Sequence, residues 1–320
     1  MTTFQEVLKT HAALTKRITE SDLRLEKLRD KFAENDDGFS KSEISVFCAG
    51  SIARGEVGEH SDLDLFLVSL KQAPFLEQTQ ILAEVIKVND NLGYPTISGD
   101  GKFLKVHQLD SMLEALGSPS DDSENLFTTR MVMLLESRAA CNEEVYDEFL
   151  TTVAGHYFRD QRGKKSFRPL FFLNDILRYW RTLCLNYELI RDNPDLPWRK
   201  KNINLKFSRM LTVFGTVLPL ISMPVTSESD LTPLLRMRPL ERFASGLDSI
   251  GDGSFQQGFE EFLDNYEKFL CWKEDIGVNS DDSCIVDSEV REASSQFSDY
   301  IYNVLQHEKI SPELRKFLLI

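Results

Sequence analysis

Two short apolar runs joined by a polar, glycine-bearing connection constrain the fold of this chain most strongly. The runs span residues 44–48 and 63–68, and the connection spans 50–61. Apolar runs of this length bounded by turn residues are typical of buried strands. The pattern therefore predicts a strand, a turn into a short helix, and a second strand. We also expect a helix at 77–88 and a third strand at 103–107.

The remainder of the chain has the periodicity of helices. Apolar residues recur at intervals of three and four over 3–33, which predicts an N-terminal helix. From Leu126 onward the chain reads as almost entirely helical, with candidates at 126–137, 142–160, 169–192, 203–218, 255–273, 286–307 and 312–319. The predicted fold class is α+β: a small mixed-sheet domain over 1–140, including the N-terminal helix, and an all-helical domain over 141–320.

Composition excludes several classes of protein. With 42% hydrophobic and 28% charged residues, the chain is of the globular type and not disordered. The longest apolar stretch, residues 210–225, is interrupted by Pro219 and Pro224, so no membrane span is expected. The N-terminus lacks the apolar core of a signal peptide. We therefore expect a cytoplasmic protein.

Cysteine and histidine patterns favour neither a disulfide framework nor a zinc site. The five cysteines are scattered and odd in number, no CxxC pair occurs, and the five histidines are dispersed. Free thiols in a reducing compartment are the expectation.

The charge of the chain is unevenly distributed. Net charge is −14, which argues against a surface that coats nucleic acid, yet residues 155–210 hold 13 Lys and Arg against 5 Asp and Glu. Two interpretations stay open for this basic segment. It forms a site for an anion, or its cations pair with acidic neighbours across a domain interface.

Asp62 and Asp64 are the first candidate site residues. Side chains at i and i+2 of a strand point to the same face, so both carboxylates leave the sheet together while Leu63 enters the core. Adjacent carboxylates repel each other unless a cation compensates them. Magnesium takes oxygen ligands and keeps substrate phosphates as further ligands, so it suits this pair.

Gly50 and Ser51 follow the first predicted strand. Glycine lets the backbone approach a phosphate closely, and the adjoining amides and the Ser51 hydroxyl can donate to its oxygens. Arg54, one turn further on, could contact the same phosphate. Glu56 and Glu59 are interpreted as solvated loop acids.

Gly50-Ser51, a spacer of ten residues, and Asp62-x-Asp64 resemble the signature of the DNA polymerase β-like nucleotidyltransferase superfamily. The resemblance covers residues 40–110; a weaker one, over 134–146, is to bacterial uridylyltransferase-like nucleotidyltransferase domains. The resemblance to the superfamily implies that Asp62 and Asp64 hold Mg²⁺ or Mn²⁺. It also implies that Gly50 and Ser51 hold the β- and γ-phosphates of a nucleoside triphosphate (NTP). An acceptor group would then attack the α-phosphate and release pyrophosphate.

The sequence departs from the superfamily pattern on the third strand, where many members carry a third carboxylate. Here Lys105 and His107 share a face of that strand. His107 could serve as a general base, or it is an ordinary histidine at the end of a strand. Candidate substitutes for the missing acid are Asp100, Asp110 and Glu136.

The helical half supplies candidates for the rest of the nucleotide site. Lys206 and Arg209 lie three residues apart on a predicted helix, and the resemblance implies that cations of this part reach the triphosphate. Trp180 and Tyr187 could stack on a base, or they belong to the core.

These patterns predict a metal-dependent nucleotidyltransferase that moves a nucleoside monophosphate from an NTP, ATP by default, to a protein or oligonucleotide acceptor. The helical domain could also dock a protein partner. The alternative is a non-catalytic module that senses a nucleotide or neutralises a partner through a degenerate site. Retention of Asp62, Asp64, Gly50 and Ser51 favours activity, and the missing third acid favours the alternative.

Overall fold

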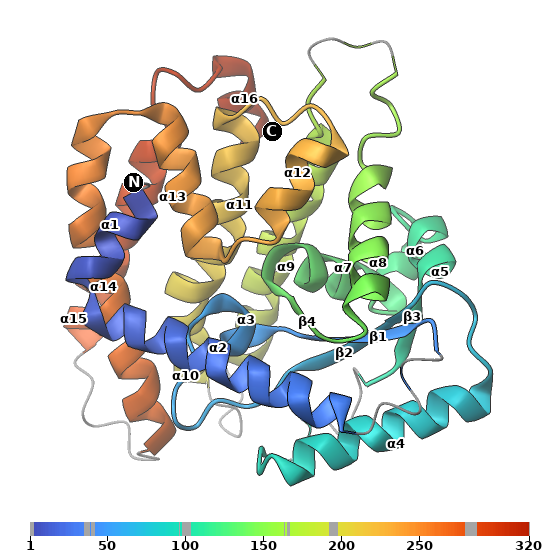
Figure 1. The fold of residues 1–320 in the computed structure, drawn as a ribbon. Coiled ribbons are helices and arrows are strands. Elements are labelled where there is room, and N and C mark those ends of the chain that lie inside the picture. The colour runs from blue at the N-terminus through green and yellow to red at the C-terminus, as the bar shows by residue number, and fades with distance from the viewer. Residues whose placement is uncertain are drawn as a thin grey trace.

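The computed structural model describes residues 3–34, 39, 42–95, 97, 104–162, 164, 167–191, 198–278 and 287–319. It confirms the predicted fold class, because a small mixed sheet near the N-terminus is followed by a helical C-terminal region (Figure 1).

The N-terminal part contains α1 (Thr3–Thr10), α2 (Ala12–Ala33), β1 (Ile44–Cys48), α3 (Gly50–Arg54), β2 (Leu65–Ser69), α4 (Phe75–Asn91), β3 (Val106–Gln108), α5 (Leu109–Glu114), α6 (Pro119–Ser123), α7 (Leu126–Glu136) and β4 (Arg138–Cys141). The helical part contains α8 (Glu143–His156), α9 (Leu170–Arg191), α10 (Trp198–Asn204), the π-helical turn η2 (Leu205–Arg209), α11 (Met210–Ser222), α12 (Glu228–Leu235), α13 (Pro239–Ile250), α14 (Gly253–Val278), α15 (Asp287–Leu305) and α16 (Pro312–Phe317).

The sheet has the order β3-β2-β1-β4. β1 pairs antiparallel with both β2 and β4, and β2 pairs parallel with β3. Strand β4 was not predicted, because its sequence, Arg-Ala-Ala-Cys, has no run of β-branched or aromatic residues. Its pairing with the fully buried β1 is a tertiary effect. β2 begins at Leu65, so Asp62 and Asp64 precede the strand and do not lie within it as predicted.

Alternation along the strands sends side chains to two separate layers. Val46 and Leu67 point to one face, where they pack with Leu28 and Phe32 of α2 and Val85 of α4. In Figure 1, α2 and α4 are the two helices that run along the lower side of the sheet.

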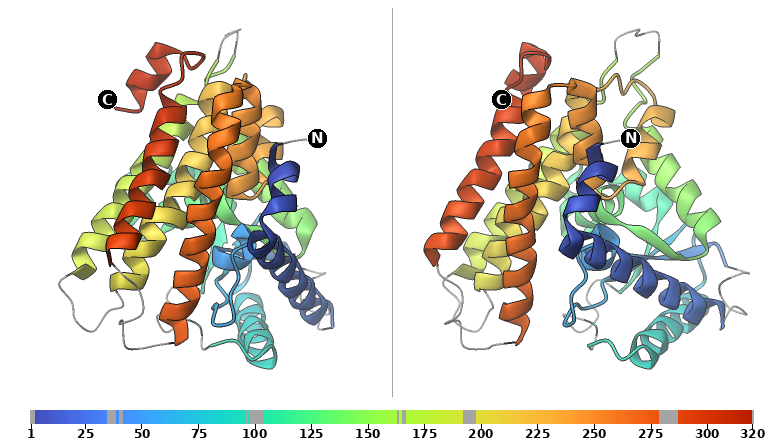
Figure 2. Two further views of the ribbon diagram at one scale, coloured as in Figure 1. Left: turned by 90° about the vertical axis from the view of Figure 1, so that its left-hand side faces the viewer. Right: turned by 60° about the vertical axis from the view of Figure 1, so that its left-hand side comes forward.

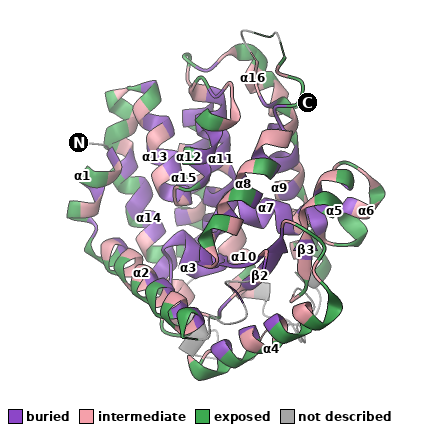
Figure 3. Cartoon of the chain, turned by 45° about the vertical axis from the view of Figure 1, so that its right-hand side comes forward, coloured by how far each residue is buried: buried purple, intermediate pink, exposed green. Residues whose placement is uncertain are grey.

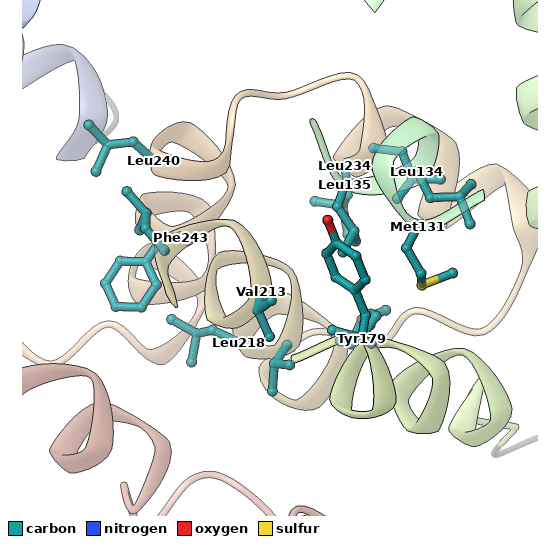
Figure 4. Packing of buried hydrophobic residues seen from close by; sticks show 14 of the residues in the cluster. Met131, Leu134, Leu135, Tyr179, Val213, Leu218, Leu234, Leu240 and Phe243 are labelled. Carbon is teal, nitrogen blue, oxygen red and sulfur yellow. The ribbon is translucent and has the colours of Figure 1, made fainter. Parts of the chain in front are cut away.

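The other face of the sheet joins the core of the helical part. Phe47 and Val68 belong to the same buried cluster as residues of α7, α9, α11 and α13. Figure 4 shows part of this cluster, with Met131 and Tyr179 close to Leu135. The core is therefore continuous across residue 140, and the division into two domains there stays a proposal.

The C-terminal helices pack lengthwise, as Figure 2 shows for α14 and α15. Several bounds differ from prediction. The N-terminal helix is broken at His11 into α1 and α2, and α12 and α13 were not expected. The polar Ser227–Asp230 segment is the capping box that begins α12.

One helical stretch among the described residues, Arg199–Ser222, is long and apolar enough to cross a membrane by length and composition. Of its apolar window, 67% is buried inside the fold, as expected of a core helix. Cys48, Cys184 and Cys271 are free thiols, and Cys284 lies outside the described residues.

Candidate functional site

A cavity of about 640 Å³ lies between the N-terminal part and the helical part. Its walls come from α2, α3, the loop 55–64, α9, α10, η2 and α14. Of the predicted site residues, Ser51, Arg54, Asp62, Asp64 and Arg209 all line it. Figure 3 shows α3 as a buried element next to α2.

Asp62 and Asp64 reach the cavity from an extended segment just before β2. The Ala49 N–H donates to the Asp64 carbonyl at 2.9 Å, which extends the pairing of β1 and β2 by one step. Leu63 between the two acids is buried, so alternation still separates it from them. Burial, together with the neighbouring charge of Asp62, raises the pKa of Asp64.

Gly50 lies directly beneath Asp64. Its φ is +68°, and a Cβ atom there would sit 2.3 Å from Asp64 Oδ2. The next residue, Ser51, is buried, and its Oγ has no hydrogen-bond partner. A buried hydroxyl without a partner carries a desolvation cost that a ligand oxygen would relieve. The turn therefore offers an unused donor beside two carboxylates, as a phosphate-binding site requires.

A buried group of charges forms the floor of the cavity. We call it the Glu56 cluster, and it consists of Arg54, Glu56, Glu136, Arg209 and Lys273. Arg54 Nε donates to Glu56 Oε1 at 2.9 Å, and Lys273 Nζ lies 3.4 Å from Glu56 Oε2. Glu136 pairs with both Arg54 and Arg209. Three cations therefore oppose two carboxylates, which leaves excess positive charge beside the cavity.

The prediction that Glu56 is a solvated loop acid is wrong. Its side chain is 2% exposed and accepts hydrogen bonds from Ser208 Oγ at 2.8 Å and Tyr266 Oη at 2.5 Å. Burial alone would raise the pKa of Glu56, but the Arg54 and Lys273 charges outweigh it and lower that pKa. The sequence around Glu56 is polar and glycine-bearing, which is typical of an exposed loop. Glu56 is buried because η2 and α14 pack over it. Glu59, in contrast, is exposed as predicted.

The two predicted cations of the helical part separate in the structure. Arg209 lines the cavity, whereas Lys206 is half-buried and does not. Both lie in η2, where the i→i+5 hydrogen bonding of a π-helix places residues three apart farther round the axis than in an α-helix. Lys200, Lys201 and Lys273 line the cavity in addition. Burial lowers the pKa of Lys273 to about 8.

His107 does not reach this cavity. It pairs with Val68 in the sheet, four residues beyond Asp64, or roughly 13 Å at about 3.3 Å per residue. Its ring is buried, with Nε2 3.2 Å from Thr129 Oγ1, and burial followed by the Lys105 charge lowers its pKa to about 4. We therefore leave His107 out of the proposed site.

None of the candidate substitutes supplies a third carboxylate in the described residues. Asp100 lies outside them, Asp110 is exposed on α5, and both oxygens of Glu136 are taken by arginines. The described chain holds no group of three or more residues suited to a metal ion. The carboxylate oxygens of Asp62 and Asp64 are of the type that a divalent cation takes, and a substrate phosphate and water would supply its other ligands.

The basic segment divides between its two interpretations. Lys200, Lys201 and Arg209 line the cavity, whereas Arg178 pairs with Asp122 and Asp175 at the junction with α6. The aromatic candidates divide as well. Tyr187 lines the cavity, and Trp180 packs against Phe214 with ring centroids 5.6 Å apart.

Further cavity residues carry no signal in the local sequence. Arg17 of α2 and Glu274 of α14 form an ion pair, and they hold the loop between α3 and β2. Arg17 Nη1 donates to the Val57 carbonyl at 3.0 Å, and Glu274 Oε1 accepts from the Glu59 N–H at 3.1 Å. Arg17 and Glu274 are far apart along the chain, so no local motif could have predicted this pair. The same holds for Lys273.

Residues 25–97 match the family model described as a nucleotidyltransferase domain. The match contains Gly50, Ser51, Asp62 and Asp64, and it confirms the resemblance to the polymerase β-like nucleotidyltransferase superfamily. No curated protein matches the chain.

Proposed function

Starting from a nucleotidyltransferase domain at residues 25–97, we propose that the protein transfers a nucleoside monophosphate from an NTP, ATP by default, to a protein or oligonucleotide acceptor. An acceptor oxygen bonds to the α-phosphorus, the bond from that phosphorus to the bridging oxygen breaks, and pyrophosphate leaves. One observation supports this most directly: Asp62 and Asp64, the Gly50–Ser51 turn and Arg209 meet in one cavity.

The chain's own residues would bind the triphosphate. The Gly50 backbone allows a phosphate to approach closely. The Ser51 hydroxyl, which has no hydrogen-bond partner in the free protein, would donate to a phosphate oxygen. Arg209 and Lys273 offer cationic donors from the helical part, and Glu136 and Glu56 orient them. Arg54 acts beneath them, because its guanidinium is already paired with both carboxylates. Phosphoryl transfer needs positioning and charge neutralisation above all.

Asp62 and Asp64 would hold Mg²⁺ or Mn²⁺. When bound, the divalent cation would neutralise phosphate charge and remove the repulsion between the two carboxylates. Lys200 and Lys201 at the cavity support an anionic acceptor, such as an oligonucleotide. A protein acceptor, a protein partner on the helical part and a cytoplasmic location are part of the same proposal.

A second candidate function is a nucleotide-sensing or partner-neutralising module without catalysis. The observation that favours it is the lack of a third carboxylate at Asp62 and Asp64 among the described residues.

Incubation with each labelled NTP and Mg²⁺ or Mn²⁺ tests the proposal. We expect pyrophosphate release, and a loss of about 100-fold or more in Asp62→Asn and Asp64→Asn. Asp110→Asn, an exposed acid on α5, is the matched control and should keep full turnover. Turnover that survives both substitutions would refute the site, and NTP binding without turnover would favour the sensing module.

A further inference from the structure

One section of the cavity wall is uncharged. It is formed by α9 and by the junction of α10 with η2. Leu183, Asn186 and Tyr187 share one face of α9, since they stand at i, i+3 and i+4. Asn204 and Leu205 approach from the last residue of α10 and the first of η2. This section differs in chemistry from the cations and carboxylates that line the rest of the cavity.

Asn204 carries an unsatisfied acceptor in this wall. Its Oδ1 is buried and has no hydrogen-bond partner, although the residue lines the cavity. An unpaired buried acceptor carries a desolvation cost, which a ligand donor would recover. A side-chain amide also offers donors next to its acceptor, so it complements a ligand edge that has a donor beside an acceptor.

Tyr187 supplies a flat apolar surface in the same section. Its side chain is half-buried, and among the described rings none stacks on it. Trp180, on the same helix, already packs against Phe214. A ring that lines a cavity without an aromatic neighbour suits the face of a nucleobase, because every base has a flat face that can stack on it.

We propose that Tyr187 and Asn204 form the subsite for the nucleobase of the donor NTP, and that Asn204 selects adenine. This inference rests on the proposed function. Adenine presents an amino group next to a ring nitrogen, and a side-chain amide can contact both at once. The Oδ1 atom accepts from the amino group, and the amide nitrogen donates to the ring nitrogen.

The other bases fit this amide less well. In the pose of adenine, and with Oδ1 kept at its buried position, uracil and guanine present a carbonyl oxygen where adenine has its amino group, so Oδ1 would stay unpaired. Cytosine has an amino group, but its single ring gives Tyr187 less area for stacking. The expected order of affinity is therefore ATP first, CTP second, and GTP and UTP last.

Binding of non-hydrolysable analogues of ATP, GTP, CTP and UTP to the full chain with Mg²⁺, measured by calorimetry, tests the subsite. We expect ATP to bind about 5- to 150-fold more tightly than UTP, which corresponds to a bidentate amide–base contact. Asn204→Leu should abolish this ratio by weakening ATP while leaving UTP almost unchanged. Asn204→Asp keeps the acceptor and loses the donor, so it should retain part of the ratio.

Two further variants separate stacking from selection. Tyr187→Leu should weaken all four analogues by about 5- to 150-fold, the purines more than the pyrimidines, and Tyr187→Phe should restore them. Asn202→Leu, on α10 but away from the cavity, is the matched control and should keep the wild-type ratio. Circular dichroism of each variant shows that it is folded.

The outcomes distinguish this inference from the proposed function. If no NTP analogue binds the wild-type protein, the proposed function fails, and the subsite with it. If all four bind equally, or if Asn204→Leu keeps the ratio, the base subsite is refuted while nucleotide binding stands. A preference for GTP or UTP would equally overturn the assignment of Asn204.

Discussion

Gly50 shows how a single missing side chain shapes the cavity. Its positive φ favours glycine, and the absent Cβ leaves the space that Asp64 Oδ2 occupies. Both conditions arise within the motif, since Asp64 lies just before β2, the strand that pairs with β1. The glycine of the motif is therefore needed for the position of the acid as well as for the turn.

We expect Gly50→Ala to lose turnover and NTP binding by displacing Asp64. Gly93→Ala is the matched control, because Gly93 has φ +71° with nothing within 4 Å of a Cβ. The control should cost about 1–2 kcal/mol of unfolding free energy from backbone strain alone. Gly50→Ala should cost about 1–3 kcal/mol more through the clash. Urea titration measures both, and equal costs would contradict the assigned contact.

The charged side chain of Asp64 should lower the stability of the fold although the proposed function needs it. Because burial and Asp62 raise its pKa, the charged form is disfavoured in the folded protein, and its contribution to stability falls as pH rises through that pKa. Asp64→Asn should therefore raise the melting temperature at neutral pH. Mg²⁺ should raise the melting temperature of the wild type and leave that of Asp64→Asn unchanged. A lower melting temperature for Asp64→Asn would count against the repulsion.

At the scale of elements, two helices far apart in the sequence hold the loop that carries Asp62. Arg17 of α2 and Glu274 of α14 bind backbone groups of Val57 and Glu59. The N-terminus of α2 is fastened to α14 as well, since the Leu14 N–H donates to Glu267 Oε1 at 2.8 Å. The position of the loop therefore depends on α14, which lies outside the matched family domain.

Removing this pair should impair both stability and turnover. Arg17→Ala should cost about 1–3 kcal/mol, because it breaks backbone hydrogen bonds as well as the ion pair. Lys27→Ala removes an exposed cation on the same helix, and it should cost about 0.5 kcal/mol or less. A double-mutant cycle of Arg17→Ala with Glu274→Ala should be non-additive. Strict additivity in turnover would show that the two residues do not hold the loop jointly.

At the scale of the whole molecule, the Glu56 cluster joins the two parts of the chain. Its members Arg54, Glu56 and Glu136 come from the N-terminal part, and Arg209 and Lys273 come from the helical part. Ser208 and Tyr266, also of the helical part, donate to Glu56. The hydrophobic core is continuous across the same junction. The cavity therefore exists only when both parts are docked, so we expect the isolated residues 1–140 to lack the complete site.

Glu56→Gln should destabilise the fold by about 3–5 kcal/mol, because it leaves Arg54 and Lys273 buried without their carboxylate. The lowered pKa of Glu56 gives stability that is present above its unfolded value near 4.5 and lost as pH falls toward the folded value. Urea denaturation from pH 7 to pH 3 should show a weaker acid dependence in Glu56→Gln than in the wild type. Glu261→Gln, an exposed acid of α14, should behave as the wild type.

Local sequence was sufficient for the motif and for most elements. Gly50, Ser51, Asp62 and Asp64 lie within fifteen residues of one another, and the strands beside them are short apolar runs whose periodicity is local. Long helices such as α9 and α14 were predicted for the same reason, since every turn of an amphipathic helix repeats the pattern.

Only the tertiary structure decided which other residues belong to the cavity. Glu56 is buried, and His107 is buried away from Asp62 and Asp64. Arg209 lines the cavity, whereas Lys206 does not. Lys273 and Asn204 line the cavity, although no sequence motif predicts this. The physical reason is that burial and pairing depend on contacts between elements far apart along the chain, whereas a sequence pattern reports only which side of its own element a residue faces.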